Sequence, residues 1–111
     1  LLVHLRENMH PQDRIYVYYG SEPAFRYYAP QFGFVEESYW IGAYNRDHPD
    51  QYLQEIERFA GSGRVWFLFS HNCSWCAVNE EAYILAHLEQ HGQREEALTQ
   101  TNASLYLYDL R

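Results

Sequence analysis

One stretch of the chain is apolar on both faces of an extended strand. Val65-Trp66-Phe67-Leu68-Phe69 has no polar residue at either its odd or its even positions, so neither face of a strand here can lie in water. Strands of this kind lie in parallel sheets whose two faces are covered by helices. Phe67, and Val17 in a second apolar run, are therefore predicted near the middle of such a sheet.

Helical and extended patterns alternate along the rest of the chain. Apolar spacing and capping residues predict helices over residues 1–10, 21–30, 49–60 and 79–90. Runs of β-branched and aromatic residues predict strands over residues 15–19, 39–41, 65–69 and 105–108. The order predicts a single α/β domain over residues 1–111, a three-layer sandwich with a mostly parallel sheet of about four strands and helices on both faces.

The charge balance excludes several classes of partner. The net charge is -7, and all eight cationic residues are arginines. Such a chain repels phosphate backbones and anionic lipid, so nucleic acid is excluded as a partner. No run reaches the roughly 18–20 apolar residues of a membrane span. The apolar start without a methionine predicts that this soluble domain is a piece of a longer protein.

Two cysteines follow the strongest predicted strand and precede a helix, the position of a thioredoxin-type redox pair. Cys73 and Cys76 enclose Ser74 and Trp75. That fold also needs a further strand with a cis-proline against the pair, yet no proline follows Pro49 and only one more strand is predicted. A structural disulfide or two packed thiols is the favoured interpretation, and a small thiol-disulfide oxidoreductase is the alternative.

Small and polar residues follow the first and third predicted strands. Gly20 and Ser21 come after the first, and Ser70 and His71 come at the end of the third. In open α/β sheets, ligands bind outside the carboxyl ends of the strands where the strand order reverses. If these two connections are neighbours, the four residues line one crevice and form a ligand site. A serine and a histidine without a placed acid do not form a catalytic triad.

No motif predicts a metal or a cofactor. Structural zinc needs four ligands, and His71 with the two cysteines has no second Cys/His pair at a suitable spacing. His87 and His91 are four residues apart on a predicted helix, but the glutamate between them is not at the metalloprotease position. With Glu80 and Tyr83 they are interpreted as the solvated face of that helix.

Three blocks of sequence resemble a known family. The first is Asp13-Arg14-Ile15-Tyr16-Val17-Tyr18-Tyr19-Gly20 with Glu22-Pro23-Ala24-Phe25-Arg26-Tyr27-Tyr28. The second is Arg64-Val65-Trp66-Phe67-Leu68-Phe69-Ser70-His71, followed by Asn79-Glu80-Glu81 and Leu88-Glu89-Gln90-His91-Gly92. The third is Ala103-Ser104-Leu105-Tyr106-Leu107-Tyr108-Asp109. In that order they resemble the C-terminal tail of bacterial, often cyanobacterial, membrane proteins of the dolichyl-phosphate-mannose protein mannosyltransferase type, glycosyltransferase family 39.

The resemblance implies a function for the longer protein. In that family a multi-helix membrane portion carries catalysis and takes its sugar from a polyprenyl phosphate, and no catalytic residue of it matches a position here. The implied role is an extracytoplasmic C-terminal accessory domain, attached to its own membrane-embedded portion, that helps to seat the acceptor substrate. A generic protein-interaction domain without a ligand is a further alternative.

Overall fold

The computed structural model describes residues 2–18, 22–34, 39–42, 50–70, 80–100 and 103–110. Its elements follow one another in chain order as α1 (Leu2–Asn8), β1 (Arg14–Val17), α2 (Glu22–Tyr28), the 3-10 turn η2 (Ala29–Phe32), β2 (Tyr39–Ile41), α3 (Asp50–Ile56), the 3-10 turn η4 (Glu57–Phe59), β3 (Arg64–Ser70), α4 (Glu80–His91), β4 (Gln93–Gln100) and β5 (Ala103–Asp109). None of the helices in these ranges is long and apolar enough to cross a membrane.

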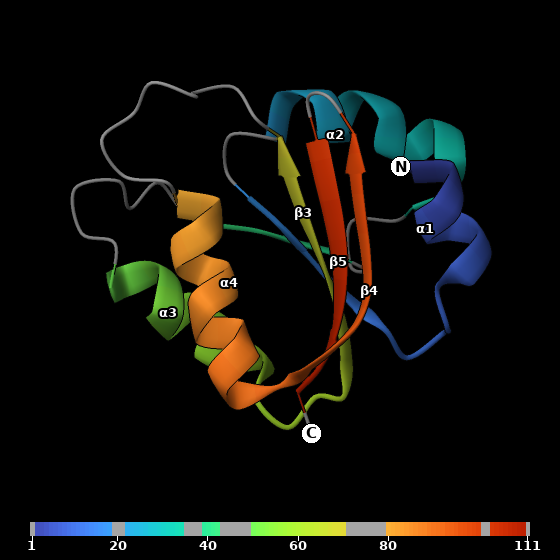
Figure 1. The fold of residues 1–111 in the computed structure, drawn as a ribbon. Coiled ribbons are helices and arrows are strands. Elements are labelled where there is room, and N and C mark those ends of the chain that lie inside the picture. The colour runs from blue at the N-terminus through green and yellow to red at the C-terminus, as the bar shows by residue number, and fades with distance from the viewer. Residues whose placement is uncertain are drawn as a thin grey trace.

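The strands form one five-stranded mixed sheet in the order β2-β1-β3-β5-β4 (Figure 1). β1 pairs in parallel with β2 and with β3. β5 is antiparallel to both β3 and β4. The α/β class is confirmed, but the predicted four strands and mostly parallel pairing differ from this sheet, because a hairpin of β4 and β5 completes one side of it.

The missed strand, β4, contains Gln93-Arg94-Glu95-Glu96-Ala97-Leu98-Thr99-Gln100. Charged and amide side chains of this kind are depleted in strands, so β-propensity gave no signal. β4 lies at the edge of the sheet, where such residues can stay in water, and its Leu98 packs against a core cluster. An irregular register between Arg94 and Glu96 also interrupts its pairing, and charges and bulges of this kind discourage edge-to-edge association.

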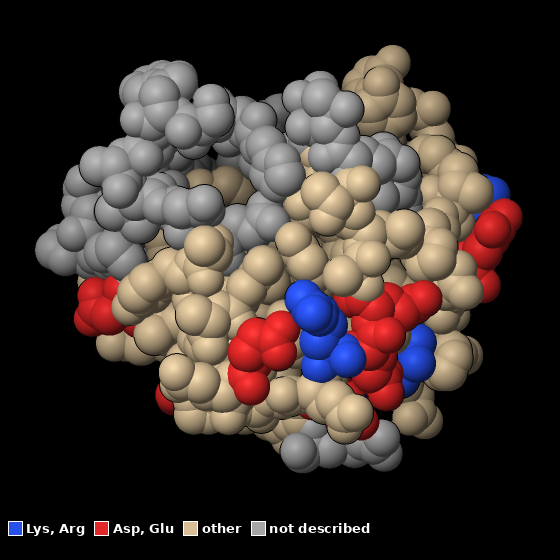
Figure 2. Space-filling view, in the orientation of Figure 1, with Lys and Arg blue, Asp and Glu red and all other residues tan. Residues whose placement is uncertain are grey.

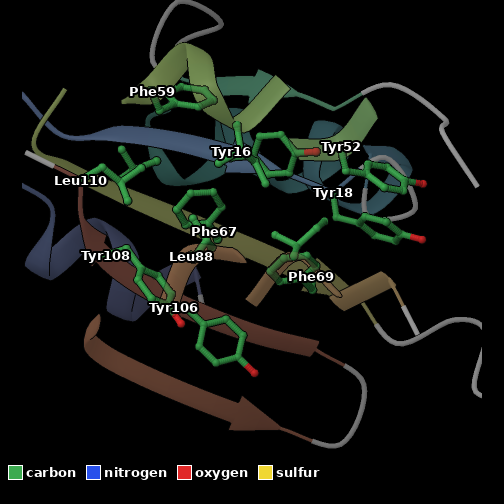
Figure 3. Close-up of a cluster of buried hydrophobic side chains, with 13 residues drawn as sticks. Tyr16, Tyr18, Tyr52, Phe59, Phe67, Phe69, Leu88, Tyr106, Tyr108 and Leu110 are labelled. Atoms are coloured by element: carbon green, nitrogen blue, oxygen red, sulfur yellow. The ribbon is translucent and has the colours of Figure 1, made fainter. Parts of the chain in front are cut away.

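Helices cover both faces of the sheet, as the two-sided apolar strand predicted (Figure 1). The face covered by α1, α2 and η2 has a largely aliphatic core with one tryptophan and one phenylalanine, made of Leu5, Ile15, Val17, Phe25, Ala29, Trp66, Leu68, Leu105 and Leu107. The face covered by α3, η4 and α4 is largely aromatic (Figure 3). Phe67 lies on the central strand and Val17 on its neighbour, both without solvent exposure, which confirms their predicted place.

The aromatic face contains two rows of rings that cross the sheet. Tyr16 contacts Phe59 and Phe67, and Phe67 contacts Tyr108, at centroid separations of 5.6–6.1 Å. The second row consists of Tyr18, Phe69 and Tyr106 and lies two residues nearer the carboxyl ends of β1 and β3. Both rows follow from the period of two along a strand, which places alternate aromatic residues of β1, β3 and β5 on one face.

Helix α4 joins the sheet through a glycine at a crowded place. The Gly92 amide donates to the Leu88 carbonyl at 2.8 Å, which ends the helix. A Cβ atom on Gly92 would lie 2.8 Å from the Asp109 carbonyl oxygen and 2.5 Å from Leu110. The end of α4 can therefore approach β5 closely only because residue 92 has no side chain.

We expect Gly92→Ala to lower the free energy of unfolding by about 1–3 kcal/mol, because a new methyl group would be forced against backbone. Urea denaturation followed by circular dichroism measures this loss. Gly61→Ala is not a suitable control because Gly61 has φ +79°. Ser62→Ala, at a nearby turn, serves as the control and should change stability by less than about 0.5 kcal/mol. A Gly92→Ala variant with the same free energy of unfolding as the wild type would contradict the close packing of α4 on β5.

Candidate functional site

The topology places a switch point between β1 and β3. The crossover through α2 leaves β1 toward β2 on one face, whereas the crossover through α4 leaves β3 toward β4 on the other face (Figure 1). The chain departs in opposite directions on the two sides of this point, and in open α/β sheets ligands bind outside the carboxyl ends of the strands at such a place. This edge of the sheet, called here the carboxyl edge, is the candidate functional site.

The backbone places β1 and β3 side by side, but the two connections that the ligand-site prediction concerns lie outside the described residues. β1 and β3 are neighbours in parallel register, with Val17 opposite Leu68, and the Tyr18 amide extends the ladder by donating to the Leu68 carbonyl at 2.9 Å. Of the predicted site residues, Ser70 ends β3 opposite Ala103 of β5. Gly20, Ser21 and His71 lie outside the described residues, so their convergence stays a prediction.

Four aromatic rings underlie the carboxyl edge, and no sequence motif predicted them as part of the site. The Tyr18 ring centroid lies 6.3 Å from that of Tyr52 on α3 and 5.7 Å from that of Phe69 on β3. The Phe69 centroid lies 6.1 Å from that of Tyr106 on β5. All four are buried. Figure 3 shows the hydroxyl groups of Tyr18, Tyr52 and Tyr106 directed toward this same end of the sheet. The sequence did hold a signal for three of them. Tyr18, Phe69 and Tyr106 each lie two residues from another aromatic residue in a predicted strand, so each pair lies on one face of its strand.

The opposite edge, at the amino ends of the parallel strands, is ionic. The arginines of the strands, Arg14, Arg64 and Arg94, all lie at or next to the first residue of their strand. The Arg94 guanidinium forms an ion pair with the Glu89 carboxylate, with 3.5 Å between nitrogen and oxygen. Figure 2 shows arginine (blue) and acidic residues (red) interspersed over the lower front of the molecule. Among the described residues, the strand arginines thus lie at the amino edge, whereas the hydroxyl groups of Tyr18, Tyr52 and Tyr106 point toward the carboxyl edge.

At the amino edge, a buried carboxylate joins the first and third strands. Asp13 is 7% exposed. It accepts hydrogen bonds from Arg64 Nε at 3.0 Å, from the His10 amide at 3.0 Å and from Trp66 Nε1 at 2.8 Å. Burial by itself raises the pKa of Asp13, but these three donors outweigh it and hold the pKa below 3.8. Because donors satisfy the carboxylate, we assign Asp13 a structural role.

The cysteine pair lies outside the described residues, so neither a disulfide nor a redox role is tested. One argument against thioredoxin-type chemistry is corrected, however, because two strands, β4 and β5, follow α4 instead of one. The other argument stands on the sequence, which has no proline after Pro49. The structure describes no group of three or more histidine, cysteine or acidic side chains that could hold a metal within the ranges listed above.

We expect no redox cycle at Cys73 and Cys76. The chain should not reduce insulin, and alkylation of Cys73 should follow a pKa close to that of a free thiol, about 8.5. Replacing both residues by serine should lower the free energy of unfolding by no more than about 2 kcal/mol, since a short closed loop constrains the unfolded chain least. Turnover of insulin, or a Cys73 pKa well below that value, would establish the oxidoreductase alternative.

Comparison with known proteins adds no assignment. No family model matches the chain, and neither a curated protein nor a solved structure matches it. The fold and the candidate site define a mixed α/β domain with a switch point between β1 and β3.

Proposed function

We propose that this chain is the extracytoplasmic C-terminal accessory domain of a membrane glycosyltransferase that takes sugar from a polyprenyl phosphate. The domain does not catalyse transfer by itself, and its carboxyl edge helps to seat the acceptor. One observation carries the proposal. The three sequence blocks that resemble family 39 glycosyltransferases include all of β1, β3 and β5, the three middle strands of the sheet. The resemblance therefore concerns the framework that builds the carboxyl edge, not scattered surface positions.

The chemistry of the two edges supports an acceptor role over a donor role. A polyprenyl-phosphate donor needs cationic or amide groups around its phosphate, but the described arginines of the strands lie at the amino edge. Tyr18, Tyr52 and Tyr106 bring rings and hydroxyl groups toward the carboxyl edge (Figure 3). Rings that combine an apolar body with a polar tip suit neutral ligands that carry hydroxyl groups.

The proposal is tested by removing single hydroxyl groups in the full-length membrane enzyme. Tyr18→Phe and Tyr106→Phe are expected to reduce transfer to large acceptors several-fold and to leave transfer to small acceptors unchanged. Tyr108→Phe is the matched control. Tyr108 lies on β5, as Tyr106 does, and its hydroxyl donates to Glu89 at 3.0 Å near the amino edge.

If all three variants transferred sugar to large acceptors equally well, the carboxyl edge would have no part in seating the acceptor. The isolated chain supplies a second readout, because an accessory domain should neither transfer sugar from a lipid-linked donor nor bind nucleic acid. Transfer by the isolated chain would overturn the assignment.

A further inference from the structure

A small groove lies between α4 and the 3-10 turn η4, on the aromatic face and away from the carboxyl edge. It encloses about 180 Å³. Ile56, Leu88 and Leu110 form its apolar floor, and Glu57, His87 and His91 provide its polar groups. The sequence predicted a solvated helix face for both histidines. The structure corrects this for His87, which is half-buried against η4, while His91 is exposed.

The two histidine rings already lie close together. His87 and His91 are one helical turn apart on α4, and their ring centroids are 4.3 Å apart at an interplanar angle of 38°. Two imidazole nitrogens that share one metal ion, each at about 2.0–2.1 Å, are roughly 3 Å apart. We expect rotation of the two side chains to bring one nitrogen of each ring to that separation, because the ring centroids are already close.

The surroundings favour a cation bound by neutral imidazoles. The neutral ring is the form that binds metals. α4 ends at His91, so its last carbonyl groups place negative potential beside the pair. Glu57 adds a carboxylate on the facing turn.

We propose that His87 and His91 form a two-histidine chelate for a late first-row divalent ion, with water completing the coordination. The described part of the chain brings no third ligand side chain into a metal-binding group with them, so the site is an exchangeable one, not a closed structural centre. Copper(II) should bind more tightly than nickel(II) or zinc(II), in line with the general order of divalent affinities for nitrogen ligands.

Copper(II) titration of the chain tests this proposal. The 111-residue chain is used with both cysteines replaced by serine, because thiolates would otherwise compete for the ion. Calorimetry should give one bound equivalent, and paramagnetic broadening in NMR spectra should be centred on the two imidazoles of α4. Lowering the pH should weaken binding, because protons compete for the same nitrogens.

Matched variants decide the outcome. His87→Gln and His91→Gln should each weaken copper affinity by more than about tenfold, since even the loss of an outer-shell partner costs 10–100-fold. His10→Gln removes an exposed histidine from the turn before β1 and should leave the affinity unchanged. Circular dichroism of each variant establishes that it is folded. Binding that survives both α4 substitutions, or broadening centred on another part of the chain, would overturn the proposal.

Discussion

Phe67→Ala is expected to lower the free energy of unfolding by about 3–5 kcal/mol, the range for removing a buried aromatic ring. Phe67 is fully buried on β3, the central strand. Its ring contacts Tyr16 at 5.6 Å and Tyr108 at 5.9 Å, so its loss opens a cavity between two neighbouring strands. Both neighbours are held by the sheet and cannot collapse into the space.

Urea denaturation measures this effect, with Tyr27→Ala as the control. Tyr27 is also aromatic but is 68% exposed on α2, so its replacement should cost less than about 1 kcal/mol. A loss at Phe67 no larger than the loss at Tyr27 would contradict the placement of β3 at the centre of the sheet. The same result would also contradict the switch point between β1 and β3, where the candidate site lies.

Asp13→Ala is expected to lower the free energy of unfolding by about 3 kcal/mol at neutral pH. The substitution leaves the Trp66 indole N–H and the Arg64 guanidinium without their shared acceptor. An unpaired buried donor costs about 1–3 kcal/mol, and more if it is charged. Glu95→Gln is the matched control. It removes only an outer carboxylate 3.6 Å from the same arginine, which should cost about 0–1 kcal/mol.

The same carboxylate predicts a particular acid response. The pKa of Asp13 is held below 3.8 in the folded chain, so folding favours its ionised form. Its contribution to stability is therefore complete above the unfolded pKa of about 3.9 and is lost as the pH falls through the folded value. Comparison of the wild type with Asp13→Ala should show the stability difference shrinking in acid. A difference independent of pH down to pH 2 would contradict the ionised, hydrogen-bonded carboxylate.

Sequence patterns predicted the parts of the fold that have strong local signals. The predicted helix over residues 21–30 corresponds to α2 and the start of η2, and the predicted helix over residues 79–90 corresponds to α4. The two-sided apolar run at Val65 was correctly placed at the centre of a helix-covered sheet. β4 could not be found in this way, because an edge strand of charged and amide residues is stabilised by its partner strand and not by its own composition.

For the candidate site, the sequence predicted a location and four lining residues, of which Gly20, Ser21 and His71 lie outside the described residues. Sequence analysis gave the carboxyl ends of the first and third strands, and β1 and β3 are indeed adjacent and parallel. The contribution of Tyr52 comes from α3, at a contact distance that no spacing in the chain reveals. The Asp13 network was missed for a similar reason. Its members are 51 and 53 residues apart in the chain and meet only because β1 and β3 begin side by side.

Deletion of residues 1–111 from the proposed full-length membrane glycosyltransferase tests the proposed function most directly. Sugar transfer would be measured in membranes with a short acceptor and with a large one, at matched amounts of inserted enzyme. An accessory domain that seats the acceptor predicts that transfer to the short acceptor continues while transfer to the large acceptor falls. Full activity on both acceptors would contradict a seating role.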